Sequence, residues 1–324
     1  MKHVSILVPR GDAVLSSIVG PFKVFNYVNS YLTTNGRKPC FDIHLVGLDE
    51  HTELYGGLFS VKPDLNISQV NTTDLVIIPA FTTDMTESVK RNEAFIPWIR
   101  QQYKMGAEVA SLCTGAFILA STGLVDGRKC ATHWFFADEF RKAFPKVNLV
   151  PEKIIVDEFG LYSSGGAYSI LNMVLYMVEK FAGREVAIAC SKMFEIEFNR
   201  ESQSSFTIFN GQKDHEDDAI KQAQHFIENN FEEKITVERL AGMFALSRRN
   251  LERRFKKATS NTPVEYMHRV KVEAAKKSLE TGREQVSEIM YRVGYNDSKT
   301  FRDIFKKYTG LSPVDYKNRY CKTA

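Results

Sequence analysis

The 324-residue chain lacks several features that would place it in a specialised class of protein. It contains no run of about eighteen apolar residues, the length that a membrane-spanning helix needs. Its first residues, MKHVSILVPRGD, include an apolar run too short for a signal peptide, and no small-residue cleavage site follows. Its five cysteines, an odd number without a CxxC pair, fit a reduced protein better than a disulfide framework. These absences predict a soluble cytoplasmic protein that does not bind a membrane.

Motifs for nucleotides and metals are also missing. Neither GxxxxGKS/T nor GxGxxG after a strand occurs, so nucleotide binding has no support from a motif. His44 and His51 lie seven residues apart, and no set of cysteines or carboxylates beside them indicates a metal site. We therefore expect no cofactor and no metal.

Composition and charge indicate a globular chain with two unlike parts. The length suggests two domains, and 44% hydrophobic with 25% charged residues is ordinary for a folded protein. Residues 213–324 contain 23 Lys and Arg against 17 Asp and Glu, whereas residues 1–212 contain 20 against 22. Positive charge concentrated in one module favours contact between that module and a polyanion.

The first part of the chain alternates short β-rich runs with helical patterns. A hairpin at 153–166 then precedes helices at 167–181 and 185–194. The alternation predicts an α/β domain over residues 1–194, with a mostly parallel sheet and helices on both faces. The β-rich runs are residues 4–9, 41–48, 74–80 and 107–113, and the helical patterns are residues 20–36 and 86–106.

The pattern changes at residues 195–218, which are polar and have no sustained period. We interpret this segment as a linker. Beyond it every pattern is helical, so residues 219–324 are predicted to form an all-α domain.

This second domain repeats itself at a shift of fifty residues, where LERRFKKATSNTPVEYMHR aligns with FRDIFKKYTGLSPVDYKNR. In the segments that precede these two, ITVERLAGMFALS aligns with EQVSEIMYRVGYND at a shift one residue shorter. We place this one-residue difference in the turn of the helix-turn-helix. Each copy is typical of a helix-turn-helix, with Ser247 capping a helix over 248–259 and Asp297 capping one over 298–309. A long helix at 263–279 is expected to join the copies as a rigid spacer.

The second helix of each copy presents cations opposite its apolar side. Leu251 with Phe255, and Phe301 with Phe305, are spaced to face a core. An exposed arginine near the start of such a helix suits the major groove of DNA, because its guanidinium bonds both acceptor atoms of guanine. A helical bundle with a basic solvated face is the alternative. The expected DNA-contact residues are Ser247, Arg248, Arg249, Glu252, Arg253, Ser298, Lys299, Arg302 and Lys306.

The last hundred residues resemble the AraC/XylS family of transcription regulators, above all in GYNDSKTFRDIFKKYTGLSPVDYKNRY. The resemblance implies two recognition helices that enter successive major grooves on one face of double-stranded promoter DNA. The base-facing positions that the resemblance implies are Arg249, Glu252, Arg253, Ser298, Lys299 and Arg302. Asp303 departs from the family pattern, in which a basic or polar residue stands near the phosphates. A carboxylate there opposes binding by the second copy.

A different pattern surrounds Cys113, which follows an apolar strand and precedes an apolar helix, with Gly115 two positions on. This is the setting of a nucleophile elbow, although Ser111 replaces the usual glycine. A helix dipole at this position is expected to lower the pKa of the thiol. We expect His133 to lie close to Cys113 in the fold.

Residues 4–183 resemble the ThiJ/PfpI-like family, of glutamine-amidotransferase-like and flavodoxin-like fold, chiefly in CTGAFILASTGLVDGRKCATHW and GPFKVF. Enzymes of this family pair the cysteine with a histidine and with an acid in the loop after the first strand. Here Ser17 stands at the position of the acid, and a hydroxyl does not replace its charge or its proton exchange. We therefore expect no catalysis. Three roles for the elbow remain open. It could form an effector pocket lined by Ser17, Cys113, Thr114 and His133, it could retain hydrolase or hydratase activity, or it could be purely structural.

Together these features predict a sequence-specific DNA-binding transcription regulator of the bacterial cytoplasm, associated with the nucleoid. Its N-terminal domain would bind an unidentified small-molecule effector or mediate formation of a homodimer, and RNA polymerase is a further candidate partner. Two alternatives stay open. One is a cysteine-dependent enzyme of the ThiJ/PfpI type that carries a DNA-binding domain, and the other is an architectural DNA binder.

Overall fold

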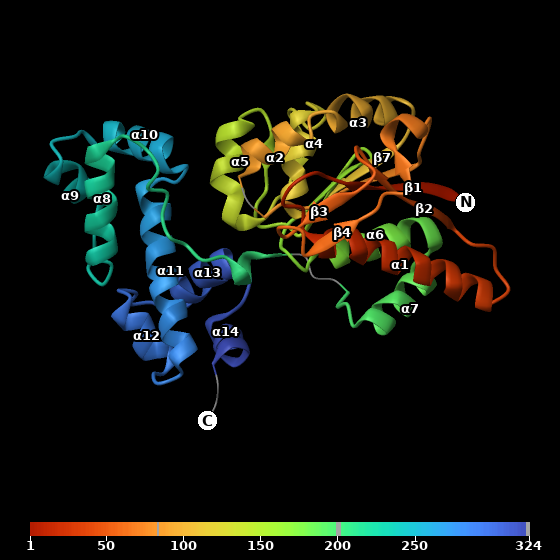
Figure 1. The fold of residues 1–324 in the computed structure, drawn as a ribbon. Helices are drawn as coiled ribbons and strands as arrows, with labels where there is room; N and C mark the ends of the chain where they lie inside the picture. The colour runs from red at the N-terminus through yellow and green to blue at the C-terminus, as the bar shows by residue number, and fades with distance from the viewer. Residues whose placement is uncertain (83, 199–201, 322–324) are drawn as a thin grey trace. The chain divides into compact units, whose positions relative to one another are not determined.

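The computed structural model describes residues 1–82, 84–198 and 202–321 (Figure 1). It divides into two compact units, Met1–Gln203 and Ser204–Ala324. The division falls inside the segment predicted as a linker. In the described part of the chain, no helix is both long enough and apolar enough to cross a membrane.

The N-terminal unit is built on a seven-stranded sheet in the order β10-β11-β7-β6-β1-β2-β5. All neighbouring strands are parallel except the edge pair β10 and β11, which form the predicted hairpin. Two small ribbons pair β3 (Thr52–Leu54) with β4 (Phe59–Val61) and β8 (Lys129–Cys130) with β9 (Asn148–Leu149). The sheet strands are β1 (Lys2–Val8), β2 (Phe41–Gly47), β5 (Leu65–Asn66), β6 (Leu75–Ile78), β7 (Glu108–Ser111), β10 (Ile155–Glu158) and β11 (Leu161–Ser164).

Helices cover both faces of this sheet, as predicted (Figure 1). One face packs on α1 (Leu15–Thr34), α6 (Ile170–Ala182) and α7 (Arg184–Phe194). The other packs on α2 (Met85–Arg91), α3 (Phe95–Lys104), α4 (Ala116–Ser121) and α5 (Ala137–Ala143). Because both faces are buried, the central strands are almost wholly apolar, which explains why their sequences do not alternate.

Two predicted helix boundaries are wrong for local reasons. The helix predicted from Gly20 begins at Leu15, and Pro21 lies inside it. The single helix predicted over 86–106 is two helices, interrupted after Arg91. The buried Asn92 side chain donates to the carbonyls of Arg10 and Ser88 and accepts from the Arg10 N–H. Asn92 thus ties the end of α2 to the loop after β1, which a helical pattern alone does not reveal.

The C-terminal unit is all helical and has two cores, one for each predicted copy. The first core joins α8, α9 and α10 to the first half of α11, and the second joins the remainder of α11 to α12, α13 and α14. The spacer helix predicted over 263–279 is therefore confirmed as α11. The helices are α8 (Asp218–Asn229), α9 (Val237–Met243), α10 (Arg248–Thr259), α11 (Pro263–Thr281), α12 (Val286–Arg292), α13 (Ser298–Thr309) and α14 (Pro313–Tyr320).

The repeat extends to individual hydrogen bonds. Thr259 at the end of α10 donates to the Phe255 carbonyl at 2.8 Å, and Thr309 of α13 makes the same bond to Phe305 at 2.8 Å. After each threonine a residue with positive φ, Ser260 at 58° or Gly310 at 75°, ends the helix.

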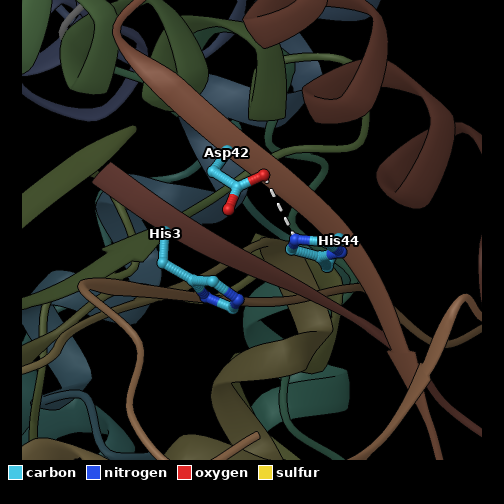
Figure 2. A group of neighbouring side chains, drawn as sticks. All are labelled: His3, Asp42 and His44. Atoms are coloured by element: carbon cyan, nitrogen blue, oxygen red, sulfur yellow. Dashed lines mark ion pairs between the residues drawn. The ribbon is translucent and has the colours of Figure 1, made fainter. Parts of the chain in front are cut away.

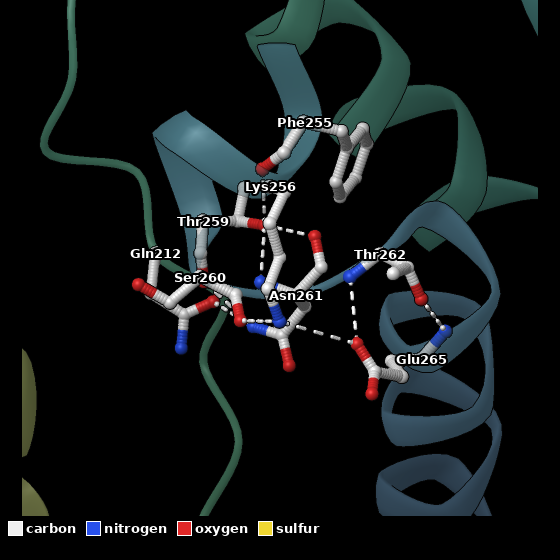
Figure 3. Close-up of polar contacts among 8 residues, drawn as sticks. All are labelled: Gln212, Phe255, Lys256, Thr259, Ser260, Asn261, Thr262 and Glu265. Carbon is white, nitrogen blue, oxygen red and sulfur yellow. Dashed lines mark hydrogen bonds and ion pairs between the residues drawn. The ribbon is translucent and has the colours of Figure 1, made fainter. Parts of the chain in front are cut away.

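The next helix then begins in the same way in both copies, at a capping residue followed by proline. In the first copy, the Thr262 N–H donates to Glu265 while the Glu265 N–H donates to the Thr262 hydroxyl (Figure 3). In the second copy, the Asp315 N–H donates to the Ser312 hydroxyl. The duplication predicted from sequence is thus a duplication of structure.

The one-residue difference between the copies lies in the turn, as expected. The turn after α9 places Ala245 at a φ of 52°, and the longer turn after α12 uses Gly294 at 76°. A non-glycine residue in this left-handed region costs about 1–2 kcal/mol. Glycine avoids this cost, but it increases the conformational entropy of the unfolded chain and thereby lowers the free energy of unfolding by about 0.4–1 kcal/mol.

Ala245→Gly is therefore expected to stabilise the C-terminal unit by about 0.5–1 kcal/mol. Calorimetry of the full chain checks this as a higher melting temperature for the transition of that unit. Ala274→Gly, inside α11, is the matched control and is expected to destabilise by about 1 kcal/mol. A destabilised Ala245→Gly variant would contradict the strain at this turn.

Candidate DNA-binding helices and cysteine elbow

The first expected DNA-contact helix is α10, and Ser247 sets its start. The Ser247 hydroxyl accepts a hydrogen bond from the Asn250 N–H at 3.3 Å, so the predicted cap is confirmed. Leu251 and Phe255 are fully buried, as predicted from their spacing. Arg248, Arg249 and Arg253 are exposed and Glu252 is half-buried.

The arginines of α10 differ in what they already bind. Arg248 is held between two carboxylates, Glu238 of α9 at 2.5 Å and Glu252 at 3.0 Å, which raise its pKa and partly neutralise its charge. The Arg253 guanidinium donates to the Asn250 side chain at 3.0 Å and makes no ion pair with the described residues. The Arg249 side chain makes no hydrogen bond or ion pair in the described part of the chain. Arg249 and Arg253 are therefore the cations of α10 most available to a ligand.

The second expected DNA-contact helix, α13, is built in the same way. Asp297 caps it by accepting from the Thr300 N–H at 2.7 Å, and Phe301 and Phe305 are buried beneath it. Its cations are less compensated than those of α10, because the side chains of Arg302 and Lys306 form no hydrogen bond or ion pair within residues 1–82, 84–198 and 202–321. Ser298, Lys299, Arg302, Asp303 and Lys306 are all exposed.

A buried lysine fixes the turn before α13. Lys271 of α11 donates through Nζ to the Val293 carbonyl at 2.9 Å, and burial lowers its pKa. A Cβ added to Gly294 would lie 2.4 Å from this Nζ and 2.5 Å from the Glu232 carbonyl oxygen. Glycine is therefore required here both for its positive φ and for the close approach of Lys271. This contact ties the turn between α12 and α13 to α11.

The elbow predicted at Cys113 is present in the N-terminal unit. Strand β7 ends at Ser111, Cys113 has a φ of 54°, and a 3-10 turn over Cys113–Gly115 leads into α4. A Cβ on Gly115 would lie 2.5 Å from the carbonyl oxygens of Ile78 and Pro79. Hence only glycine allows the elbow to pack this closely on the end of β6.

The thiol at this elbow is not activated. Cys113 is 6% exposed, and burial raises the pKa of its thiol to about 11. The expectation that the helix dipole lowers this pKa is therefore wrong. The helix adds a partial charge, but removing a thiolate from water costs more than a partial charge returns.

The other residues predicted at the elbow have structural partners. The Ser17 hydroxyl donates to the Val14 carbonyl at 2.6 Å and accepts from the Ala80 N–H at 2.9 Å. The Thr114 hydroxyl donates to the Phe81 carbonyl and accepts from the Phe81 N–H, both at 2.7 Å. Ser17, which stands at the position of the acid, and Thr114 thus hold two adjacent residues of the loop after β6, Ala80 and Phe81.

His133 lies near the elbow through its neighbour Thr132, whose hydroxyl donates to the Cys113 carbonyl at 3.2 Å. Its own ring accepts a hydrogen bond from the Phe135 N–H at 3.2 Å and packs against Trp134. Burial lowers the pKa of the imidazole. Among the described residues there is no hydrogen bond between the Cys113 thiol and His133, so the two do not form an ion pair here.

Alkylation of Cys113 is expected to be slow at neutral pH and to accelerate through pH 9–10, because the thiolate forms only near pH 11. Mass spectrometry of the peptide that contains Cys113, after timed treatment with iodoacetamide, measures this rate separately from those of the other thiols. Cys321, half-buried near the C-terminus, is the internal reference. A plateau already reached near pH 6 would show an activated thiolate and would restore the enzyme hypothesis.

The N-terminal unit contains a cavity of about 430 Å³ that no sequence motif had indicated. It lies between β10 and α6, and polar or charged groups on separate elements line it. Arg184 packs on Phe198 at its edge, 4.4 Å from the ring centroid. Its charged lining residues are Lys153, Asp157, Glu179, Arg184 and Glu197.

Two family models match the chain in the two units. The model of the DJ-1/PfpI family matches residues 12–180, which is more than half of the chain. A helix-turn-helix domain model matches residues 240–319. The first range contains Ser17, Cys113 and His133, and the second contains α10 and α13.

Individual proteins agree with this division. The HTH-type transcriptional regulator GbdR of Pseudomonas aeruginosa is 26% identical over 302 residues, which cover 93% of this chain and 79% of that protein. CdhR of the same species, also an HTH-type transcriptional regulator, is 23% identical and covers 92% and 85%.

The crystal structure of a protein from Vibrio parahaemolyticus is 26% identical with a TM-score of 0.53, and the match covers 59% of this chain and 98% of that one. The chain therefore belongs to the DJ-1/PfpI family and joins that domain to an AraC-type helix-turn-helix domain, the combination of a DNA-binding transcription regulator.

Proposed function

We propose that this protein reads promoter DNA with α10 and α13 and that a small molecule bound by its N-terminal unit controls this activity. The observation that carries the proposal is the duplicated pair of capped, cationic helices, each buried on one side only and both packed on α11. A single basic helix is common on protein surfaces. Two copies held on one helix can contact neighbouring major grooves together, which a single basic helix cannot do.

One helix connects the two expected DNA-contact helices. Helix α11 has 19 residues, so it is about 28 Å long at 1.5 Å per residue, and α10 and α13 pack on its successive halves. Successive major grooves on one face of DNA lie about 34 Å apart. Simultaneous contact with two grooves therefore requires the exposed faces to project outward from α11 or the DNA to bend toward them.

For the N-terminal unit we propose effector binding without turnover. The buried thiol, the hydroxyl of Ser17 at the position of the acid and the separation of Cys113 from His133 all oppose nucleophilic catalysis. The elbow loops around Cys113, Thr114 and His133 are one candidate binding site, and the cavity beside α6 is the other.

Gln203, the last residue of the N-terminal unit, supports a route from effector to DNA. It is 2% exposed, and its side chain donates to the carbonyls of Thr132 and Lys153 and accepts from the Trp134 N–H at 3.3 Å. Thr132 in turn bonds Cys113. A ligand that moves the 132–134 loop thus acts directly on the residue from which the chain continues to the DNA-binding unit. It regulates only by favouring one arrangement over the other.

We also propose binding partners and a cellular location for this protein. A second copy of the chain would double the DNA contacts, so we propose a homodimer at paired half-sites. We propose RNA polymerase as a partner on DNA and the bacterial cytoplasm, at the nucleoid, as the location, since promoter DNA lies there.

Selection of bound fragments from a random DNA pool, with and without a metabolite extract, tests the proposal. We expect enrichment of one sequence with paired half-sites, and a shift in its Kd when the extract contains the effector. Binding should be measured at fixed salt, because phosphate contacts alone give strong salt dependence without sequence preference. Equal affinity for all sequences would favour the architectural alternative and contradict the proposal.

A further inference from the structure

A cluster of metal-ligating side chains lies outside both sites described above. It joins His3 of β1 to Asp42 and His44 of β2, and one ligand atom from each lies within 4.8 Å of the others (Figure 2). The parallel register pairs His3 with Asp42 and Ser5 with His44, so all these side chains leave the same face of the sheet. The cluster lies near the amino ends of the strands, whereas Cys113 follows the carboxyl end of β7. It is therefore at the opposite edge of the sheet from the elbow.

In both rings Nδ1 contacts an oxygen outside the cluster, so Nε2 is the nitrogen that faces the other proposed ligands. His44 Nδ1 is 2.8 Å from an Asp64 oxygen, and His44 Nε2 is 3.2 Å from Asp42 Oδ1. His3 Nδ1 is 2.9 Å from the Thr73 hydroxyl, which itself donates to the His3 carbonyl at 3.0 Å. Since that hydroxyl proton is used, the Thr73 oxygen accepts from His3 Nδ1–H, and His3 Nε2 carries the lone pair.

We propose that His3, Asp42 and His44 bind a divalent first-row transition-metal ion through the two Nε2 atoms and an Asp42 oxygen. Imidazole nitrogen suits Zn²⁺, Fe²⁺ and Ni²⁺, and the carboxylate adds charge. Ligating histidines in proteins almost always donate their other ring N–H to an oxygen, and here Asp64 and Thr73 stand at those positions.

Distance and charge both agree with an ion at this point. Ligands of a tetrahedral zinc ion lie about 3.3 Å apart, and the 3.2 Å between Asp42 and His44 already matches this. Rotation of the His3 ring, which now stacks on His44 with centroids 4.8 Å apart, brings in the third nitrogen. Water completes the coordination. Asp42, Asp64 and Asp74 lie near His3, and Lys2 forms an ion pair with Asp74 at 3.2 Å.

A protonated His44 that bridges Asp42 and Asp64 is the competing explanation of the same contacts. It requires no metal and gives His3 no role beyond stacking. The two explanations differ in what happens when a metal ion is offered to the protein.

Titration of the full chain with Co²⁺, after treatment with a chelator, distinguishes them. We expect saturable binding of one equivalent with visible absorption bands, which Zn²⁺ abolishes by displacement. His3→Ala and His44→Ala should each remove this signal. Asp64→Asn, which leaves all three ligands in place, should weaken binding about 10- to 100-fold. His51→Ala and Cys40→Ser are the matched controls and should bind like the unaltered chain.

Circular dichroism of each variant establishes that it is folded. Asp42 is exposed, so Asp42→Asn removes the charge of one of the three proposed ligands and is expected to stay folded even where a histidine variant is unstable. The proposal is overturned by an unaltered chain that shows no saturable Co²⁺ binding, or by binding that persists in folded Asp42→Asn and His44→Ala variants.

Discussion

Arg253→Ala is expected to weaken binding to the preferred DNA site by about 1–3 kcal/mol, which corresponds to a Kd about 5- to 150-fold higher. The reason is the placement of Arg253 on the exposed face of α10, where its guanidinium donates to the Asn250 side chain and pairs with no carboxylate of the described residues. A guanidinium that bonds both acceptors of a guanine discriminates against the other bases at that position. The loss should therefore be concentrated on one base pair of the selected site.

The neighbouring Arg254 supplies the matched control. Its guanidinium is half-buried and bonds both oxygens of Asp217, the cap of α8, at 2.5 and 2.8 Å. Arg254→Ala removes the same charge from the same helix, but it should lower the stability of the C-terminal unit and leave the sequence preference unchanged. Competition binding against site variants and random DNA measures the difference. An equal loss for Arg253→Ala on random DNA would assign this arginine to phosphate rather than base contact.

The C-terminal unit was largely predictable because its signals are local and occur twice. Ser247 and Asp297 cap the expected helices, and the apolar pairs of both copies are buried. Spacing and capping act within a turn of helix, so a sequence pattern contains most of the information that they need. The partners of Arg248 were not predictable, because Glu238 approaches it from the preceding helix.

The N-terminal site was predictable in position but not in chemistry. The elbow at Cys113 was predicted from a strand-turn-helix pattern. The pKa of the Cys113 thiol, however, depends on its burial by segments that are far apart in the sequence. The histidine cluster was missed for a similar reason. Asp42 and His44 alternate on one strand, but only the parallel register places His3 beside them. The prediction that no carboxylates accompany His44 is wrong because Asp42 and Asp64 both contact it.

Phe305→Ala is expected to destabilise the second helix-turn-helix copy by about 3–5 kcal/mol. Phe305 is fully buried in α13, with Tyr316 edge-on at 5.5 Å and Phe301 at 5.8 Å between ring centroids. Removing the ring leaves a cavity among these aromatics. Since whole domains are stable by only about 5–15 kcal/mol, most of the stability of this copy would be lost.

The matched variant is Phe255→Ala, because Phe255 packs on Tyr266 at 5.2 Å in the same arrangement. Hydrogen exchange of backbone amides in the full chain measures where each variant opens. The two cores of the unit share α11 and the side chain of Phe231 but little else. Phe305→Ala should therefore deprotect α12 to α14 while α8 to α10 keep their protection, and Phe255→Ala should do the reverse.

The same pair of variants connects this architecture to DNA binding. A copy that has opened no longer presents its cationic helix, so Phe305→Ala should lose the contacts of α13 and keep those of α10. Because each lost phosphate contact lowers the slope of log K against log salt by about 0.9, the salt dependence should become shallower as the affinity falls. The selected site should then tolerate substitutions in one half only. If both copies open together in either variant, the unit folds as one cooperative body, and α11 does not act as a spacer between two independently stable readers.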